Sequence, residues 1–210
     1  MSEAHPSVAG PKAVVFDVGN VLFHWDLRFL FDRLIVDPAR REHFLSEVLT
    51  FEFHTRHDAG EPIDRLASEL RAAHPEYADE IHAYVTRFNE TVGGPVAGVH
   101  ELVHRLYEQD VPLFALTNFG TDFWQGFRPT APILLRFRDI LVSGEEKLAK
   151  PDPAIYRRAE ERFAHAADQL FFIDDREENI AAARACGWHA HLFSDAETLE
   201  AELRSRGFLR

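Results

Sequence analysis

The chain has 210 residues, of which 46% are hydrophobic and 28% are charged, and its 23 basic and 35 acidic residues give a formal net charge of −12. This composition is typical of a globular protein with enough apolar material for a core, and the length suits one large domain or a domain that carries an insertion. The acidic balance argues against a nucleic-acid partner, because nucleic-acid binding requires a basic surface.

Residues 1–12 are polar and include Pro6, Gly10 and Pro11. They lack the apolar stretch of a signal peptide, and no run in the chain is long enough to cross a bilayer. The single cysteine, Cys186, cannot form an internal disulfide, so nothing indicates an oxidising compartment. We therefore expect a cytoplasmic protein that has no membrane partner.

The first structured segment is the apolar run from Ala13 to Phe16, which ends in Asp17. A run that is apolar on both faces is typical of a strand buried in a parallel sheet. Gly19 and Asn20 then predict a turn, because both residue types tolerate positive φ.

The following region, about residues 26–90, changes in character. Apolar residues recur there at helical spacing, and Asp37-Pro38, Gly60-Glu61-Pro62 and His74-Pro75 interrupt the pattern. This pattern predicts about four short helices and no strand. We therefore predict a small helical cap over residues 25–91, inserted into a core domain that is formed by residues 1–24 and 92–210.

Helices and strands alternate after Gly93 and Gly94. Strands are predicted at 111–116, 140–142, 170–173 and 189–193, and helices at 99–106, after Pro153, at 177–185 and at 196–204. Alternation of this kind indicates a parallel sheet with helices on both faces. The predicted fold class is thus α/β, with a Rossmann-like parallel sheet core and the inserted helical cap.

Polar side chains follow three of the predicted strands where each strand ends. They are Asp17, Thr117, Asn118, Asp174 and Asp175. Ligands of open parallel sheets bind beyond the carboxyl ends of the strands, so these side chains should lie together at one edge. Three carboxylates would repel one another there unless a cation lay among them, and oxygen ligands with open positions suit Mg²⁺.

Chemistry suggests a role for each group at this edge. The Asp17 carboxylate is a nucleophile that can form an aspartyl-phosphate, which water then hydrolyses. Thr117 and nearby backbone N–H groups can hold phosphoryl oxygens. Lys150, just before a predicted helix, supplies positive charge where negative charge gathers.

Four segments occur in the order of one known family. They are residues 16–21, residues 116–118, residues 150–153, and residues 172–175 continuing to Asn179. With them the chain resembles the haloacid dehalogenase-superfamily hydrolases of the branch with a helical cap after the first motif. Within that superfamily it is most similar to bacterial sugar-phosphate phosphatases of the glucose-1-phosphate phosphatase type.

The resemblance implies a set of metal ligands. Asp17 would be both nucleophile and ligand, Gly19 would bind through its carbonyl, and Asp175 would be the main distal ligand. Asp174 would be a second acid near the ion. The expected cofactor is Mg²⁺, and the expected partner is a small phosphorylated molecule, with a homodimer left open.

The resemblance also implies that Thr117, Asn118 and Lys150 bind the phosphoryl group. Asn179 falls where many relatives carry an acid that supports the metal or the lysine. The expected reaction is Mg²⁺-dependent hydrolysis of a small phosphomonoester, with a sugar phosphate favoured.

Gly19 departs from the family pattern, because most phosphatases of the superfamily carry a second aspartate there as general acid. Such an acid commonly contributes ~10²–10⁴-fold in rate. An anomeric hydroxyl leaves readily, which would suit a sugar 1-phosphate and tolerate glycine. Alternatively, His24 or a histidine of the cap could donate the proton. In the helical insert, His54 and His57 lie near Arg56, where the cap could contact the substrate.

Other functions compete with this hypothesis. A 2-haloacid dehalogenase also lacks the second aspartate, although it would place neutral residues at the Asp174-Asp175 pair. A non-catalytic binding protein on the same fold is a further alternative. The sequence from His100 to His104 also matches the His-Glu-x-x-His pattern of zinc proteases, for which no third ligand is evident.

Overall fold

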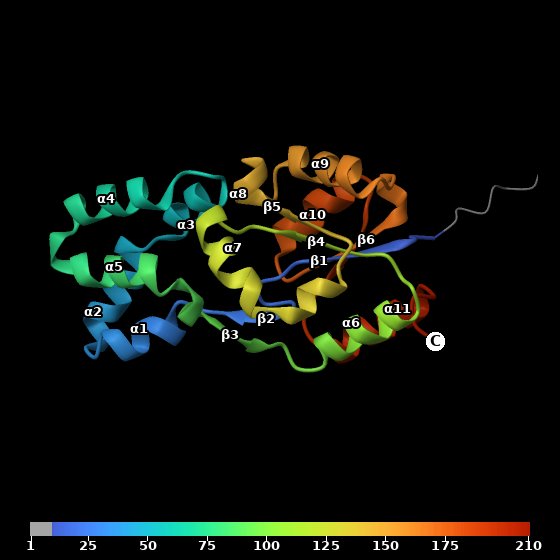
Figure 1. Cartoon of the computed structure of the whole chain (residues 1–210), viewed down its shortest axis with the longest axis horizontal. Coiled ribbons are helices and arrows are strands. Elements are labelled where there is room, and N and C mark those ends of the chain that lie inside the picture. The colour runs from blue at the N-terminus through green and yellow to red at the C-terminus, as the bar shows by residue number, and fades with distance from the viewer. Residues whose placement is uncertain (1–9) are drawn as a thin grey trace, which may run out of the picture.

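The central sheet is parallel. The computed structural model describes residues 10–210, and in this range five strands pair in the order β5-β4-β1-β6-β7 (Figure 1). They are β1 (Ala13–Phe16), β4 (Leu113–Thr117), β5 (Asp139–Val142), β6 (Leu170–Asp174) and β7 (His189–Leu192), and every pairing is parallel. The predicted Rossmann-like α/β fold is confirmed.

Helices cover both faces of the sheet. The side chains of β1 alternate, so that Val14 and Phe16 belong to one apolar cluster and Ala13 and Val15 to the other. The first cluster contains the buried faces of α6 (Val99–Glu108) and α11 (Ala196–Ser205), and the second those of α9 (Pro153–Phe163) and α10 (Glu177–Ala185). In Figure 1, α9 lies above the sheet, and α6 and α11 lie below it.

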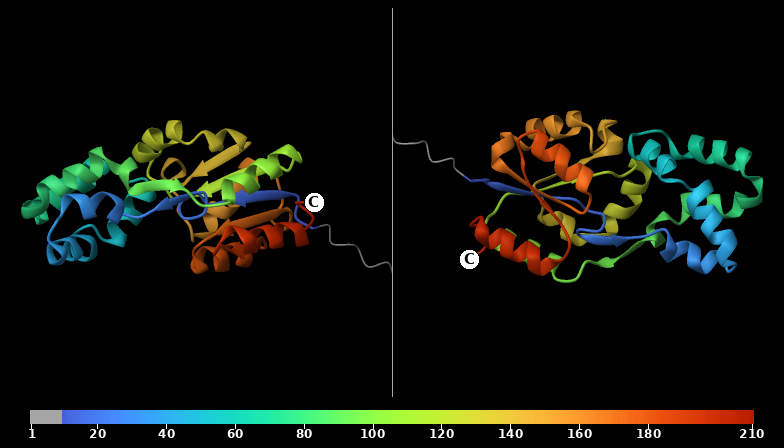
Figure 2. Two further views of the ribbon diagram at one scale, coloured as in Figure 1. Left: turned by 90° about the horizontal axis from the view of Figure 1, so that it is seen from below. Right: turned by 180° about the vertical axis from the view of Figure 1, so that it is seen from behind.

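A separate group of helices lies beyond one end of the sheet in all three views (Figures 1 and 2). These cap helices are α1 (Arg28–Leu34), α2 (Pro38–His43), a π-helical turn (Phe44–Val48), α3 (Phe51–Asp58), α4 (Ile63–Ala73) and α5 (Ala78–Thr86). The apolar pattern indicated about four helices and omitted α3. The sequence of α3 mixes aromatic residues with histidines and charged residues, so it gives no clear apolar stripe.

An antiparallel ribbon connects the cap helices to the sheet, and the sequence did not predict it. Its strands are β2 (Phe23–Trp25) and β3 (Val92–Pro95). Both strands are short, and the Gly-Gly-Pro sequence of β3 is more typical of a loop. Gly93 is needed there, because a Cβ atom at this position would lie 2.8 Å from the ring of Phe29.

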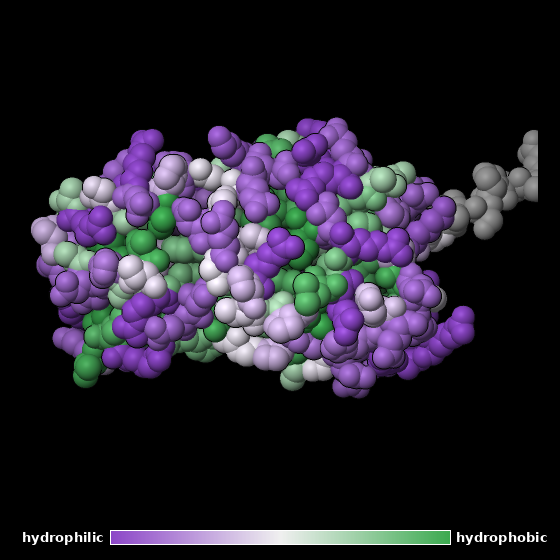
Figure 3. Space-filling view, viewed as in Figure 1, coloured by the Kyte–Doolittle hydropathy of each residue, from purple (hydrophilic) through white to green (hydrophobic). Residues whose placement is uncertain are grey.

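The remaining elements are short. They are α7 (Thr121–Phe127), α8 (Ser143–Glu146) and the 3₁₀ turns Pro75–Tyr77, Phe88–Thr91, Arg128–Thr130, Pro132–Arg136 and Ala167–Gln169. No helix in residues 10–210 has both the length and the apolar character that crossing a membrane requires. On the face shown in Figure 3, hydrophilic residues surround smaller hydrophobic areas.

Candidate active site

The predicted site residues converge at the carboxyl ends of three neighbouring strands. Asp17 follows β1, Thr117 ends β4 and Asp174 ends β6, and β1 lies between β4 and β6 in the sheet. One carboxylate oxygen from each of Asp17, Asp174 and Asp175 lies within 4.8 Å of the other two. The sheet order therefore brings together acids that are more than 150 positions apart in the chain.

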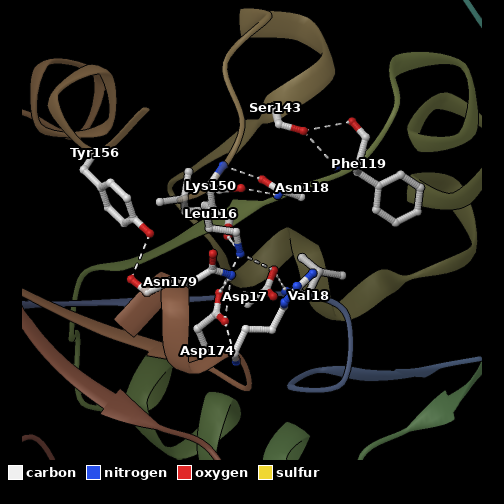
Figure 4. Close-up of polar contacts among 11 residues, drawn as sticks. Asp17, Val18, Leu116, Asn118, Phe119, Ser143, Lys150, Tyr156, Asp174 and Asn179 are labelled. Carbon is white, nitrogen blue, oxygen red and sulfur yellow. Dashed lines mark hydrogen bonds and ion pairs between the residues drawn. The ribbon is translucent and has the colours of Figure 1, made fainter. Parts of the chain in front are cut away.

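The Lys150 ammonium lies in the middle of this cluster and is almost fully buried (Figure 4). Its Nζ atom is 2.9 Å from Asp17 Oδ1 and 2.7 Å from Asp174 Oδ2, and it donates to the carbonyl oxygen of Leu116 at 3.0 Å. The ammonium thus lies between two carboxylates at the floor of the site. Lys147, in contrast, is exposed.

Asp174 is completely buried, and protein groups occupy both of its oxygens. Oδ1 accepts the backbone N–H of Arg176 at 2.8 Å, and the Asn179 side chain donates to both oxygens at 3.0 Å. The Asn179 carbonyl in turn accepts the hydroxyl of Tyr156 at 2.9 Å. Asp174 is thus held as an anchor for Lys150, and Asp175 is the more accessible acid of the pair.

Asn118 holds the backbone of Lys150. Its side-chain nitrogen donates to the Lys150 carbonyl at 2.9 Å, and its side-chain oxygen accepts the Lys150 N–H at 2.8 Å. Because the amide is used in this way, the phosphate contact predicted for Asn118 would have to come from its backbone N–H. Thr117 is buried at the end of β4.

The sequence did not reveal the role of Asn20. Its φ angle is +53°, which places it in the left-handed region that the Gly19-Asn20 turn signal predicted. The side-chain oxygen accepts the N–H of Trp25 at 2.9 Å, and the side chain also lies close enough to Asp175 to lower its pKa. Asn20 therefore links the start of the β2–β3 ribbon to an acid of the cluster.

The acids of the cluster carry more negative charge than the protein neutralises. Burial raises the pKa of Asp17 to about 7, against the lowering effect of Lys150, and the charges of Asp174 and Asp175 raise it further. The pKa of Asp175 is raised by burial and then by Asp174. A divalent cation would relieve this repulsion, and oxygen atoms within 4.8 Å of one another fit the donor set that Mg²⁺ prefers.

A cavity of about 310 Å³ opens above the cluster. Its floor is polar, with Asp17, Thr117, Lys150 and Asp175. Its walls are largely aromatic and include Phe23, Trp25, Phe51, Tyr84, Phe88, Phe119 and Phe127. The cavity therefore combines an anion-binding floor with an apolar upper chamber between the sheet and the cap helices.

Two nitrogen atoms in the cavity wall have no hydrogen-bond partner among the described residues. They are Trp25 Nε1 and His54 Nε2. The other ring nitrogen of His54 is 2.8 Å from the Tyr84 hydroxyl, and burial lowers the pKa of His54 to about 4. At neutral pH His54 is thus an uncharged polar group in an aromatic wall.

The His100–His104 pattern lies on α6, away from any cluster of ligands. His100 Nε2 donates to the carbonyl oxygen of Leu22 at 2.9 Å, and its ring packs edge-on against Phe23. Within residues 10–210, the one group of three or more such side chains close enough to share a metal ion is the aspartate cluster. His100 therefore has a packing role.

A parallel α/β sheet with acids and a lysine at its carboxyl edge is the architecture of an enzyme that acts on an anionic ligand. Residues 11–187 match the sequence profile of the haloacid dehalogenase-like hydrolases. The chain belongs to this family, and it is therefore a hydrolase.

Known proteins that resemble the chain include two phosphatases and an enzyme of known structure. A sesquiterpene phosphatase from Aspergillus oryzae is 28% identical over 200 residues, which cover 92% of this chain and 95% of that protein. The validoxylamine A 7′-phosphate phosphatase of Streptomyces hygroscopicus subsp. limoneus is 27% identical over 125 residues, 59% of this chain and 58% of that protein. A HAD family enzyme from Bacteroides thetaiotaomicron, solved with magnesium and inorganic phosphate, shares the fold with a TM-score of 0.68 and 20% identity, covering 89% of this chain and 96% of that one.

Proposed function

We propose that the protein is a magnesium-dependent phosphatase that hydrolyses a small phosphomonoester through an aspartyl-phosphate on Asp17. The observation that carries this proposal is the cluster of three acids around one buried lysine at the floor of a cavity. The two phosphatases among the relatives support it.

Magnesium would be held by Asp17, the Gly19 carbonyl and Asp175, with Asp174 beside them. The ion would screen the acids and neutralise the charge of the phosphoryl oxygens. Asp17 Oδ1 already binds Lys150 and the N–H of Val18, so the carboxylate is held in one orientation. This orientation favours attack on a phosphorus atom that lies above the cavity floor.

The chain's own residues would then divide the work on the phosphoryl group. The Asp17 carboxylate attacks phosphorus, and Lys150 and the Thr117 hydroxyl bind the phosphoryl oxygens. Asn118 keeps Lys150 in place through its backbone. The cap helices exclude bulk water during transfer, and they must open for exchange.

The walls of the cavity favour a substrate with an apolar organic group. The sequence favoured a sugar phosphate, but sugar hydroxyls buried against aromatic rings would lose hydrogen bonds with water at a cost of ~1–3 kcal/mol each. Trp25 Nε1 and His54 Nε2 could form hydrogen bonds with one or two polar groups of the substrate at most. The Aspergillus oryzae relative is a sesquiterpene phosphatase, which supports a terpenoid phosphate as substrate.

A substrate panel tests this proposal. Purified protein is assayed for phosphate release from farnesyl phosphate, glucose 1-phosphate and p-nitrophenyl phosphate, with Mg²⁺ and with EDTA, and for chloride release from 2-chloropropionate. We expect Mg²⁺-dependent phosphate release, with the highest kcat/KM on farnesyl phosphate. Chloride release without metal would instead identify a dehalogenase, and the absence of all turnover would indicate a binding protein.

The Asp17→Asn variant is the control for the nucleophile. We expect it to lose at least ~10³-fold in kcat, because an amide cannot form the acyl-phosphate. The change is nearly isosteric, so circular dichroism should be unchanged. Wild-type turnover by the folded variant would contradict the assignment.

A further inference from the structure

The position of the missing general acid is empty space. Apart from the two chain neighbours of Gly19, no atom of residues 10–210 lies within 4 Å of a Cβ atom added there, so no side chain fills the space where the absent acid would begin. A simple alcohol is a poor leaving group, and a phosphatase that releases one needs a proton donor at its oxygen. The donor must therefore come from another part of the cavity wall.

We propose that Asp58, at the end of helix α3, is the general acid that protonates the leaving group. This inference rests on the proposed phosphatase function. Asp58 lines the same cavity as Asp17, Thr117 and Lys150, and it reaches the cavity from the side of the cap helices.

In-line transfer places the donor on that side. The attacking and leaving oxygens lie on opposite faces of phosphorus, roughly in line. Asp17 attacks from the floor, so the leaving oxygen points away from the sheet toward the cap helices. Asp58 lines the cavity together with the cap residues His54 and Tyr84 and with Lys150 of the floor.

Contacts with the core hold the end of α3 in place. The backbone carbonyl of Asp58 accepts the Ser143 hydroxyl at 2.5 Å, and this hydroxyl also accepts the N–H of Phe119 at 2.9 Å. Figure 4 shows Ser143 and Phe119 in contact, beside Lys150 and Asn118. The backbone N–H of Gly120 is close enough to the Asp58 carboxyl to lower its pKa.

The protonation state of Asp58 suits an acid at neutral pH. Burial raises the pKa of Asp58 to about 7, although the Gly120 N–H and Lys150 act in the opposite direction. The other titratable side chains close by are Tyr84 on α5, whose pKa Asp58 helps to raise, and His57 in the same turn of α3. Asp122 on α7 and Lys147 after α8 lie next to His57 and Gly60, respectively.

The histidines considered from the sequence suit this role less well. His24 is exposed and does not line the cavity. His54 lines it, but with a pKa of about 4 it carries no proton to donate near pH 7 and already contacts the Tyr84 hydroxyl. His57 is buried against Phe123, and burial lowers its pKa as well.

The reaction then balances in two steps. In the first step, an Asp17 oxygen bonds to phosphorus, the bond from phosphorus to the substrate oxygen breaks, and the Asp58 proton moves to that oxygen to give a neutral alcohol. In the second step, Asp58 as carboxylate takes a proton from water while the water oxygen bonds to phosphorus. The aspartyl bond breaks, and this releases inorganic phosphate and restores Asp17 and protonated Asp58.

The test compares leaving groups in the Asp58→Asn variant. We expect a loss of ~10²–10⁴-fold in kcat on an alkyl phosphate such as farnesyl phosphate. On p-nitrophenyl phosphate, whose leaving group needs no proton, the loss should be below about tenfold. Asp64→Asn, an exposed acid on the neighbouring helix α4, is the matched control and should leave both rates unchanged.

A second variant separates catalysis from folding. The space beside Gly19 is open, so an aspartate can be introduced there. The double variant Gly19→Asp/Asp58→Asn should have a kcat on the alkyl phosphate at least about tenfold above that of Asp58→Asn. Equal losses on both substrates, or full alkyl phosphatase activity in Asp58→Asn, would overturn the assignment. If wild-type protein hydrolyses neither substrate, the proposed phosphatase function is wrong, and so is the role of Asp58 that rests on it.

Discussion

At the residue scale, the site is defined by one cation among three carboxylates. Lys150 forms ion pairs with Asp17 and Asp174 and donates to the Leu116 carbonyl, and Asn179 donates to both oxygens of Asp174. A buried ion pair of this kind is costly to break, because the remaining partner would be left charged without water. The cluster is therefore rigid before any ligand binds.

Asp58 should make the stability of the protein depend on pH. Its pKa rises from 3.8 to about 7 on folding, so the folded protein keeps a proton that the unfolded chain releases between these values. The stabilisation is complete below about pH 4 and is lost as the pH rises through 7. The Tm of wild-type protein relative to Asp58→Asn should therefore fall between pH 5 and pH 8.

Differential scanning fluorimetry across this pH range measures the difference. Asp64→Asn serves as reference, because its carboxylate is exposed. A constant difference between wild-type protein and Asp58→Asn would show that the carboxyl titrates normally in the folded state.

At the scale of elements, the approach of α3 to the loop after β4 depends on Gly120. A Cβ atom there would lie 2.0–2.4 Å from ring atoms of His57, so no larger residue fits without movement. We expect Gly120→Ala to shift the end of α3, to destabilise the protein by ~1–3 kcal/mol, and to lower kcat on alkyl phosphates.

Urea unfolding and steady-state kinetics measure these two effects. Gly94→Ala is the control, because Gly94 is exposed and a Cβ atom there meets nothing within 4 Å. If Gly120→Ala had the stability and the kcat of wild-type protein, His57 would be able to move aside without affecting the site.

The sequence was sufficient for the elements that depend on burial. The apolar runs before Asp17 and Asp174 predicted both strands, and parallel pairing then predicted that their acids would meet. It was insufficient for α3 and the β2–β3 ribbon, because their stability comes from packing rather than from a periodic pattern. Asp58 was missed for the same reason, since only the folded chain shows that it faces the cavity.

At the scale of the whole molecule, magnesium should stabilise the folded state. A ligand that binds only the native protein contributes RT ln(1 + [L]/Kd), or about 2.7 kcal/mol at a hundredfold excess over Kd. We expect Mg²⁺ to raise the Tm of wild-type protein and to have little effect on Asp175→Asn, in which the more accessible acid of the cluster is neutral. Calorimetric titration of both proteins with MgCl₂ measures this, and equal binding by the variant would exclude Asp175 as a ligand.

The β2–β3 ribbon has a consequence for how the substrate specificity of such enzymes can change. The chain leaves the sheet through Phe23–Trp25 and returns through Val92–Pro95, so the segment between these strands is covalently connected to the core only through this ribbon. Evolution or a protein engineer can exchange that segment as one cassette and leave the phosphoryl chemistry below it intact. If Asp58 is the acid, however, the exchanged cassette must bring its own proton donor, and selectivity and turnover would be inherited together.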